Sequence, residues 1–252
     1  MAHDTPIQGS IAPLKNVALM LTLANRLIER PRHLTGLGAF YGPSGYGKTM
    51  AAIYLQNRLN ARLVTVFHTS TRLTLLRDIL QELHVHAPKG SAYELQKQVI
   101  QILAQPGHPP LVIDEADKAV DKGFIEIIRE IQMMSFAPII LIGEELLEKK
   151  LVPIERAHGR VIKWQLAQPC DLEDAQVLAR LYAPSWLTIE PDLLAEILSK
   201  AKGRARRICN SIENVAEWAR VRGIKSVALG AFDGPIDAGE APSRTVAEGK
   251  GR

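Results

Sequence analysis

The segment from Gly42 to Thr49 limits what this chain can fold into more than any other part of the sequence. It reads Gly-Pro-Ser-Gly-Tyr-Gly-Lys-Thr and fits the pattern G-x-x-x-x-G-K-[ST]. The apolar residues 38–41 before it predict a short buried strand, and residues 48–59 predict a helix. A glycine-rich loop between a strand and a helix is typical of a phosphate site. The alternative is an ordinary glycine-rich turn with an accidental Lys-Thr pair.

The residues of this loop have separate tasks in holding a nucleotide. Glycines let backbone N–H groups curl around a phosphate, and the following helix adds the positive end of its dipole. Lys48 can reach the β and γ phosphates, and the Thr49 hydroxyl can ligate Mg²⁺. We therefore predict nucleotide contacts from the whole loop and the next residue: Gly42, Pro43, Ser44, Gly45, Tyr46, Gly47, Lys48, Thr49 and Met50.

A second apolar run, residues 111–113, ends in the adjacent acids Asp114 and Glu115. Asp114 is predicted to hold the nucleotide's Mg²⁺ through water, and Glu115 to orient and deprotonate the attacking water. The pair favours hydrolysis over phosphoryl transfer to a metabolite, which requires an acceptor site instead of a water activator. The alternative is a solvated junction between strand and loop. Asp117 is predicted to be a helix N-cap or a surface acid.

Strands and helices alternate along most of the chain. Near-continuous apolar strands separated by helices imply a parallel sheet covered on both faces. We expect an α/β P-loop NTPase fold with five parallel strands, followed by a small helical lid. The expected strands are 38–41, 62–67, 111–113, 139–142 and 161–166. The expected helices are 14–29, 48–59, 72–83, 92–104, 119–134 and 144–151, and in the lid 171–182, 191–201 and 204–222.

Composition changes suggest the domain borders. We predict a flexible N-terminus at 1–13, a nucleotide-binding domain at 14–168, a helical lid at 169–229 and a disordered tail at 230–252, where Gly, Ala, Pro and small polar residues dominate. The two cysteines, Cys170 and Cys209, are too few for a disulfide framework or a cysteine zinc site. No signal peptide and no apolar run of about 18 residues is visible, so we expect a cytoplasmic protein with no membrane partner.

Three segments together resemble the AAA+ ATPases: the loop at 42–49, the acids Asp114 and Glu115, and Gly203-Arg204-Ala205-Arg206. The last matches the family's G-x-x-R pattern at the start of a lid helix. The resemblance implies that the cofactors are ATP and Mg²⁺. It also implies that Arg206 contacts the γ-phosphate and links loss of this phosphate to lid movement. The alternative for Arg206 is a solvated basic start of a helix.

The AAA+ resemblance further implies that an arginine just before the fifth strand reaches the nucleotide of a neighbouring subunit. Arg160 is the first candidate and Arg156 the second, and such a residue neutralises charge in the transition state. The alternative for either is a surface cation at a helix end. The chain departs from the family at the end of the fourth strand, where Glu144 replaces the usual polar sensor. Glu144 could position water or act as a helix N-terminal acid, and hydrolysis is expected to be slow without a partner.

Within AAA+, the chain is similar to the transposition regulators, which include phage Mu's B protein and the target-selecting ATPases of Tn7-like and Tn5053-like elements. The shared features are the segment from Ile142 through Leu146 that leads to Arg160, and the lid segment from Lys202 to Arg207. Secretion-type motors and replication initiators share much of this pattern. The resemblance implies a bacterial or phage-encoded protein that assembles with ATP into oligomers or helical filaments, binds duplex DNA and recruits a transposase. The rivals are a secretion or pilus motor and a metabolite kinase.

Two regions are candidates for contact with DNA. In the related transposition ATPases, loops after the second strand grip the DNA backbone, which here implies Thr71, Arg72, Lys89 and Ser91. Contacts of this kind do not read bases, so binding is expected to be sequence-independent and salt-sensitive. The alternative is a helix N-cap and a turn. Residues 200–225 form the second region, with eight basic residues and two acids, although a solvated helix face explains them equally well.

Overall fold

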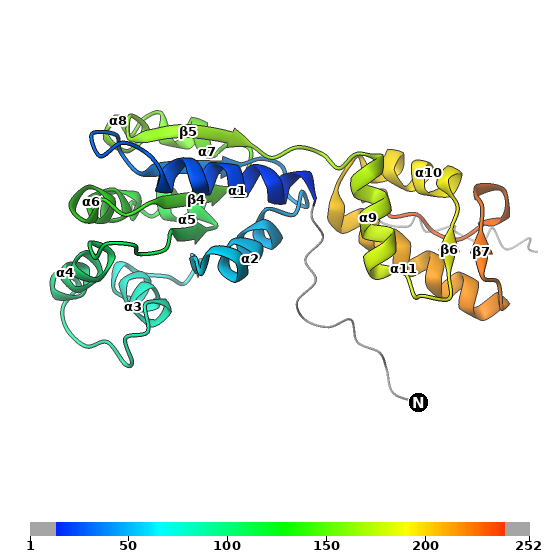
Figure 1. Ribbon diagram of the computed structural model, residues 1–252, viewed down its shortest axis with the longest axis horizontal. Coiled ribbons are helices and arrows are strands. Elements are labelled where there is room, and N and C mark those ends of the chain that lie inside the picture. The colour runs from blue at the N-terminus through cyan, green and yellow to red at the C-terminus, as the bar shows by residue number, and fades with distance from the viewer. Residues whose placement is uncertain (1–13, 240–252) are drawn as a thin grey trace, which may run out of the picture. The chain divides into compact units, whose positions relative to one another are not determined.

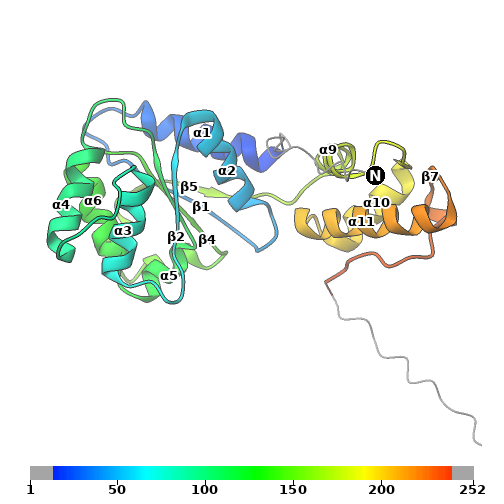
Figure 2. The same ribbon diagram turned by 90° about the horizontal axis from the view of Figure 1, so that it is seen from below.

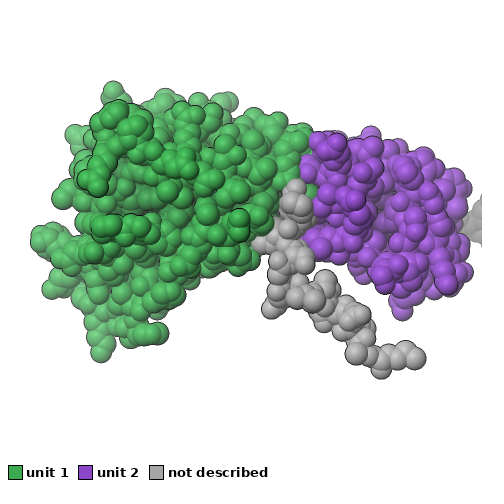
Figure 3. Space-filling view, in the orientation of Figure 1, with its two compact units in different colours: residues 1–170 green, residues 171–252 purple. Residues whose placement is uncertain are grey.

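The computed structural model describes residues 14–239, so the predicted N-terminal segment 1–13 and residues 240–252 of the predicted tail lie outside the described residues. The chain divides into two compact units. Unit 1 runs to Cys170 and unit 2 starts at Asp171, as the colours of Figure 3 show. Within the described residues, no helix is both long and apolar enough to cross a bilayer.

Unit 1 is built on a parallel sheet of five strands in the order β2-β3-β4-β1-β5. Figure 1 shows this sheet, with β4 and β5 labelled. The strands are β1 (Leu37–Tyr41), β2 (Arg62–Thr65), β3 (Leu111–Asp114), β4 (Ile139–Gly143) and β5 (Val161–Leu166). β1, β3 and β4 are almost entirely buried, as expected for strands covered on both faces. The predicted α/β class with five parallel strands is therefore confirmed.

Helices cover both faces of this sheet (Figure 2). α1 (Lys15–Ile28) and α2 (Lys48–Leu59) lie on one face, where a Cβ on Gly38 of β1 would come within 3.1 Å of Leu23 and Leu27 of α1. The opposite face packs against the larger apolar core. Its helices are α3 (Arg72–Glu82), α4 (Ala92–Leu103), α5 (Ala116–Asp121) and α6 (Ile125–Ser135). Two short helices, α7 (Leu147–Leu151) and α8 (Glu155–His158), connect β4 to β5.

Two predicted helices of unit 1 differ from the structure. The residues expected to form one helix at 119–134 belong to two helices, because Gly123 takes a left-handed φ of 70° and interrupts the helix between α5 and α6. The helix expected at 144–151 begins only at Leu147, and residues 144–146 form the turn that leaves β4.

Unit 2 is mainly helical, as expected for the lid. It contains α9 (Leu172–Tyr182), α10 (Pro191–Ala201), α11 (Ala205–Arg222), a small ladder of β6 (Thr188–Ile189) with β7 (Ser226–Val227), and a 3-10 helix, η1 (Leu229–Ala231). Asp171 caps α9 by accepting from the Asp174 backbone N–H at 3.0 Å. Cys170 of unit 1 and Cys209 of unit 2 are not disulfide-bonded.

The segment that follows η1 packs along α11, whereas the composition predicted disorder from residue 230. Phe232 packs edge-on against Trp218, with ring centroids 5.3 Å apart. Asp237 accepts from Asn210 at 2.9 Å, and its backbone N–H donates to Ser211 at 2.9 Å. Composition alone overlooked these contacts because α11 supplies the partners.

Candidate nucleotide-binding site

The loop from Gly42 to Thr49 joins the end of β1 to the start of α2. Gly47 immediately precedes the helix and takes a φ of 79°. A Cβ on Gly47 would meet nothing within 4 Å, so the backbone conformation, not crowding, favours glycine at this position. The loop therefore has the left-handed glycine backbone that phosphate-binding loops use to present N–H groups.

Lys48 lies across this loop. Its ammonium donates to the carbonyl oxygens of Gly42 at 2.6 Å and Pro43 at 2.9 Å. Burial lowers the pKa of Lys48, and nearby carboxylates, of which Asp114 has the largest effect and Glu144 the next, oppose that shift. Lys48 is a half-buried cation whose ammonium is hydrogen-bonded to neutral carbonyls. An anionic ligand such as a phosphate would stabilise its charge.

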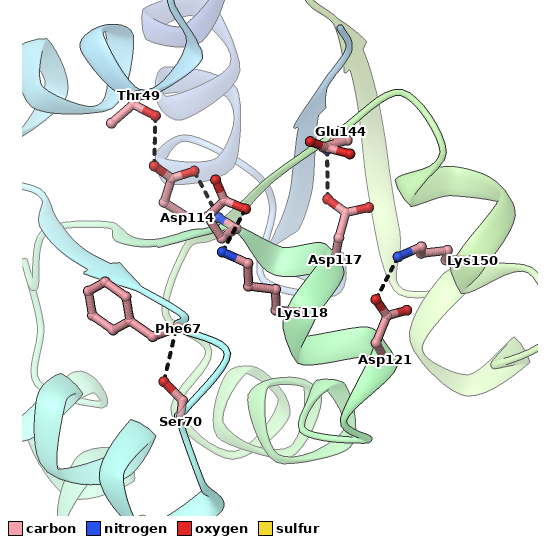
Figure 4. Close-up of polar contacts among 10 residues, drawn as sticks. Thr49, Phe67, Ser70, Asp114, Asp117, Lys118, Asp121, Glu144 and Lys150 are labelled. Carbon is pink, nitrogen blue, oxygen red and sulfur yellow. Dashed lines mark hydrogen bonds and ion pairs between the residues drawn. The ribbon is translucent and has the colours of Figure 1, made fainter. Parts of the chain in front are cut away.

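Thr49 and Asp114 meet at the carboxyl edge of the sheet (Figure 4). The Thr49 hydroxyl donates to Asp114 Oδ2 at 2.8 Å, and the backbone N–H of Glu115 donates to Asp114 Oδ1 at 2.8 Å. Burial raises the pKa of Asp114, and the two hydrogen bonds partly offset this. A hydroxyl and a buried carboxylate are the hard oxygen ligands that Mg²⁺ prefers, so the residues present fit this ion.

The remaining Mg²⁺ ligands would come from phosphate and water. Among residues 14–239, no three His, Cys, Asp or Glu side chains gather as a metal site of their own. Mg²⁺ commonly keeps several waters and binds through one or two protein oxygens plus substrate phosphates. The pairing of Thr49 with Asp114 is therefore suited to a nucleotide-borne ion.

Glu115 follows Asp114 in a left-handed backbone conformation, with φ 57°. Its carboxylate pairs with Lys118 at 3.2 Å, and the Glu115 side chain is 42% exposed. This carboxylate therefore has access to water at the end of β3. Met50, the third residue of α2, is exposed.

Asp117 corrects a prediction from the sequence, because it is neither a helix N-cap nor a surface acid. Glu115 occupies the N-cap position of α5, and Asp117 lies in the first turn with only 6% of its surface exposed. Asp117 Oδ2 accepts from the backbone N–H of Glu144 at 2.6 Å. The cause is the strand order: β4 lies between β1 and β3, so its end is beside the helix that follows β3.

Sequence reasoning overlooked Asn16. This amide is 4% exposed on α1 and donates to the carbonyls of Tyr46 in the phosphate loop and of Gln168, both at 2.8 Å. Asn16 Oδ1 also accepts from the Gln168 backbone N–H at 2.8 Å. Asn16 thus joins the loop to the segment just before the end of unit 1. The available signal was an amide on the apolar face of a predicted helix.

We expect Asn16→Ala to lower the free energy of unfolding by roughly 1–3 kcal/mol, because it removes a buried amide and leaves partly buried backbone groups of Tyr46 and Gln168 without their partner. Urea denaturation of the whole chain measures this. Thr22→Ala is the matched control, since Thr22 lies exposed on the same helix and bonds only to the Ala18 carbonyl. Equal effects of the two substitutions would contradict a special role for Asn16.

The predicted arginines lie in different surroundings. Arg160 is half-buried, and its guanidinium contacts the sulfur of Met133 on α6 at 3.8 Å. Arg156 is exposed on α8, and Arg206 is exposed in the first turn of α11 in unit 2. Of the two candidates before β5, Arg156 is thus the more accessible to another molecule.

The predicted DNA contacts separate into caps and exposed cations. The Thr71 hydroxyl caps α3 by accepting from the Thr74 N–H at 3.2 Å. The Ser91 hydroxyl caps α4 by accepting from the Glu94 N–H at 3.4 Å, and it donates to the Glu94 carboxylate at 2.9 Å. These hydroxyls are therefore used within the chain, whereas Arg72 and Lys89 are exposed.

The basic region at 200–225 is partly neutralised inside unit 2. Lys200 pairs with Glu196 at 3.3 Å, and Arg207 donates to the Ala238 carbonyl at 2.7 Å. Arg222 lies 4.3 Å from the ring centroid of Trp218 and pairs with Asp233. The two ion pairs lower the net charge that the region offers to a nucleic acid, and the carbonyl and ring contacts hold Arg207 and Arg222 within unit 2.

The sheet order, the loop after β1 and the acids after β3 together define a P-loop NTPase fold of the AAA+ type. Residues 32–151 match the AAA domain family. No curated protein sequence matches the chain.

Solved structures of archaeal proteins share the fold. ORC2 of Aeropyrum pernix, in its ADP form, gives a TM-score of 0.66 at 15% identity, covering 88% of this chain and 68% of that one. ORC1 of the same organism, in complex with DNA, gives 0.63 at 20% identity, covering 86% and 63%. CDC6P of Pyrobaculum aerophilum gives 0.65 at 18% identity, covering 90% and 67%. The chain thus spans about two thirds of the length of these proteins.

Proposed function

We propose that this chain is an ATPase whose nucleotide state controls its binding to duplex DNA. The observation that carries the proposal is the contact of the Thr49 hydroxyl with Asp114 Oδ2 at 2.8 Å. It brings the start of α2, directly after the phosphate loop, to the end of β3, where Glu115 is proposed to activate water. The match of residues 32–151 to the AAA domain family supports the assignment.

In this proposal, Glu115 accepts a proton from the water that attacks the γ-phosphate. Lys48 moves from the Gly42 and Pro43 carbonyls to the β and γ phosphates, where its charge offsets the charge that develops in the transition state. Mg²⁺, held by Thr49 and Asp114, neutralises phosphate charge when it is bound. For Arg206, the proposal keeps the role that the AAA+ resemblance implies, which is to sense the γ-phosphate.

Contact with DNA is proposed through exposed cations on unit 1. Arg72 opens α3 and Lys89 precedes α4, so both present charge outside the covered faces of the sheet. ORC1 of Aeropyrum pernix, which shares the fold, was solved in complex with DNA. Lysine and arginine contacts with phosphates position a protein without reading bases, so we propose sequence-independent binding.

Assembly is proposed to complete the ATP site. Arg156 or Arg160 of one subunit reaches the nucleotide of the next, and the exposure of Arg156 supports its candidacy. In the finer form of the proposal the ATP-bound assembly recruits a transposase to its target DNA and hydrolysis releases it. This form rests on the resemblance to the transposition regulators.

We expect Arg72→Ala combined with Lys89→Ala to weaken duplex binding by a similar factor for all sequences. The slope of log affinity against log salt should fall by about two, because each lost phosphate contact releases about one counterion fewer. Fluorescence anisotropy of labelled duplexes, with ATP and with ADP, measures both quantities.

The control removes two other exposed cations, with Arg26→Ala and Lys149→Ala, and should leave the slope unchanged. An unaltered slope in the variant that lacks Arg72 and Lys89 would show that DNA contacts other residues. A wild-type protein that binds duplex DNA equally with ATP and ADP would contradict the proposed nucleotide control.

A further inference from the structure

The functions proposed for the phosphate loop and for the acids Asp114 and Glu115 do not explain why a third acid, Asp117, lies buried beside them. It is an ionisable side chain with 6% of its surface exposed, inside a short helix that starts directly after the water-activating residue. Its Oδ2 accepts from the backbone N–H of Glu144 at 2.6 Å, and Figure 4 shows the two residues joined in this way. Glu144 is the first residue after β4.

Only one oxygen of Asp117 is satisfied. Its Oδ1 is buried and has no hydrogen-bond partner among the described residues. A buried carboxylate with an unpaired oxygen destabilises a fold, so ordinary packing does not account for an aspartate here. Folds retain a destabilising group of this kind where the side chain has a functional role.

The end of β4 closes tightly over this carboxylate. A Cβ on Gly143 would lie 2.5 Å from Asp117 Oδ2 and 2.7 Å from a side-chain carbon of Leu147. A residue other than glycine at 143 would therefore push the strand end away from Asp117. The close approach fixes the position at which the chain leaves the sheet, and the next side chain is Glu144.

Asp117 is not needed to attach α5 to α7. Asp121, at the other end of α5, already pairs with Lys150 of α7 at 2.7 Å on the surface. The carboxylates of both Asp117 and Glu144 act on Lys48, since they oppose the downward shift of its pKa. The backbone N–H of Gly42, the first residue of the phosphate loop, donates to the Gly143 carbonyl at 3.3 Å, so the contact between Asp117 and Glu144 lies directly beside this loop.

We propose that Asp117 is a positioning residue for ATP hydrolysis: by holding the backbone of Glu144, it sets where the Glu144 side chain stands at the γ-phosphate end of the loop. The inference rests on the proposed ATPase activity. Glu144 takes the place that a polar sensor usually has, and its carboxylate can accept a hydrogen bond from the water held by Glu115. A displacement of about 1 Å at such a place is enough to lower a rate by up to about 100-fold.

The experiment compares Asp117→Ala, Asp117→Asn and Asp121→Ala in the full chain, measuring kcat and KM for ATP and the affinity for a fluorescent ATP analogue. Asp117→Ala should lower kcat at least about tenfold with analogue affinity within twofold. Asp117→Asn should keep most of the activity, because its amide oxygen can still accept from Glu144. Asp121→Ala, which breaks only the surface pair, should match the wild type.

Two further variants separate positioning from loss of structure. Gly143→Ala keeps the carboxylate but displaces the strand end, so it should lower kcat as Asp117→Ala does. In a Glu144→Gln background, Asp117→Ala should cause little further loss, because the two residues act as one unit. An unchanged kcat, parallel losses of kcat and analogue affinity, or a full further loss in the Glu144→Gln background would overturn the positioning role. Absence of turnover in the wild type would instead overturn the proposed ATPase activity, and the inference with it.

Discussion

Lys48→Ala is expected to abolish ATP binding and ATP-dependent assembly together. The ammonium would make two charged contacts to phosphate, each contributing about 1.5–3 kcal/mol, so the affinity for ATP should fall by at least about 100-fold. Isothermal titration calorimetry measures the affinity, and light scattering with and without ATP measures assembly.

The fold should survive this substitution. In the free protein Lys48 contacts only carbonyl oxygens of its own loop, and burial disfavours its charged form. Removing it therefore relieves a desolvation penalty, and thermal unfolding should stay close to that of the wild type. Wild-type affinity for ATP in the variant, or assembly that no longer depends on nucleotide, would contradict the proposed control of assembly by ATP.

Glu115→Gln is expected to stop hydrolysis while ATP still binds. The amide cannot accept the proton of the attacking water, and a general base contributes roughly 10²–10⁴ to the rate. The variant should therefore remain on DNA as an ATP-bound assembly that dissociates far more slowly than the wild type. Phosphate release and the dissociation of labelled duplex after dilution measure the two effects.

The matched control is Lys118→Gln. Glu115 pairs with Lys118 at 3.2 Å on the surface, so Glu115→Gln removes an ion pair as well as a base. Lys118→Gln removes the same pair and keeps the carboxylate, and exposed pairs of this kind contribute at most about 1 kcal/mol. A similar loss of turnover in both variants would show that the ion pair, and not proton transfer, is responsible.

The parts of the site that come from continuous segments were readable from the sequence. The residues of the phosphate loop, the strand before it and the helix after it follow from local periodicity and from glycine spacing. Asp114 was placed near Thr49 because parallel strands end at one edge of a sheet, and the structure brings the two within 2.8 Å. The neighbours of Asp117 were not readable, since they depend on which strand stands between β1 and β3.

Contacts between residues that are far apart in the sequence could not be predicted either. Asn16 joins the loop at Tyr46 and the segment at Gln168, which lie 30 and 152 residues away. The segment after η1 was expected to be disordered because its composition is poor in apolar residues. Its partners come from α11, and composition carries no information about partners.

The sequence by itself therefore determined the residues on which the proposed chemistry depends: a phosphate loop, a carboxylate proposed to hold Mg²⁺ and a proposed water activator, each encoded within a few neighbouring residues. Only the tertiary structure decided the strand order. That order places β4 between the strands that carry this chemistry and brings Glu144 onto Asp117. The reason is physical, because strand pairing results from packing among distant segments, whereas backbone conformation and side-chain chemistry are properties of adjacent residues.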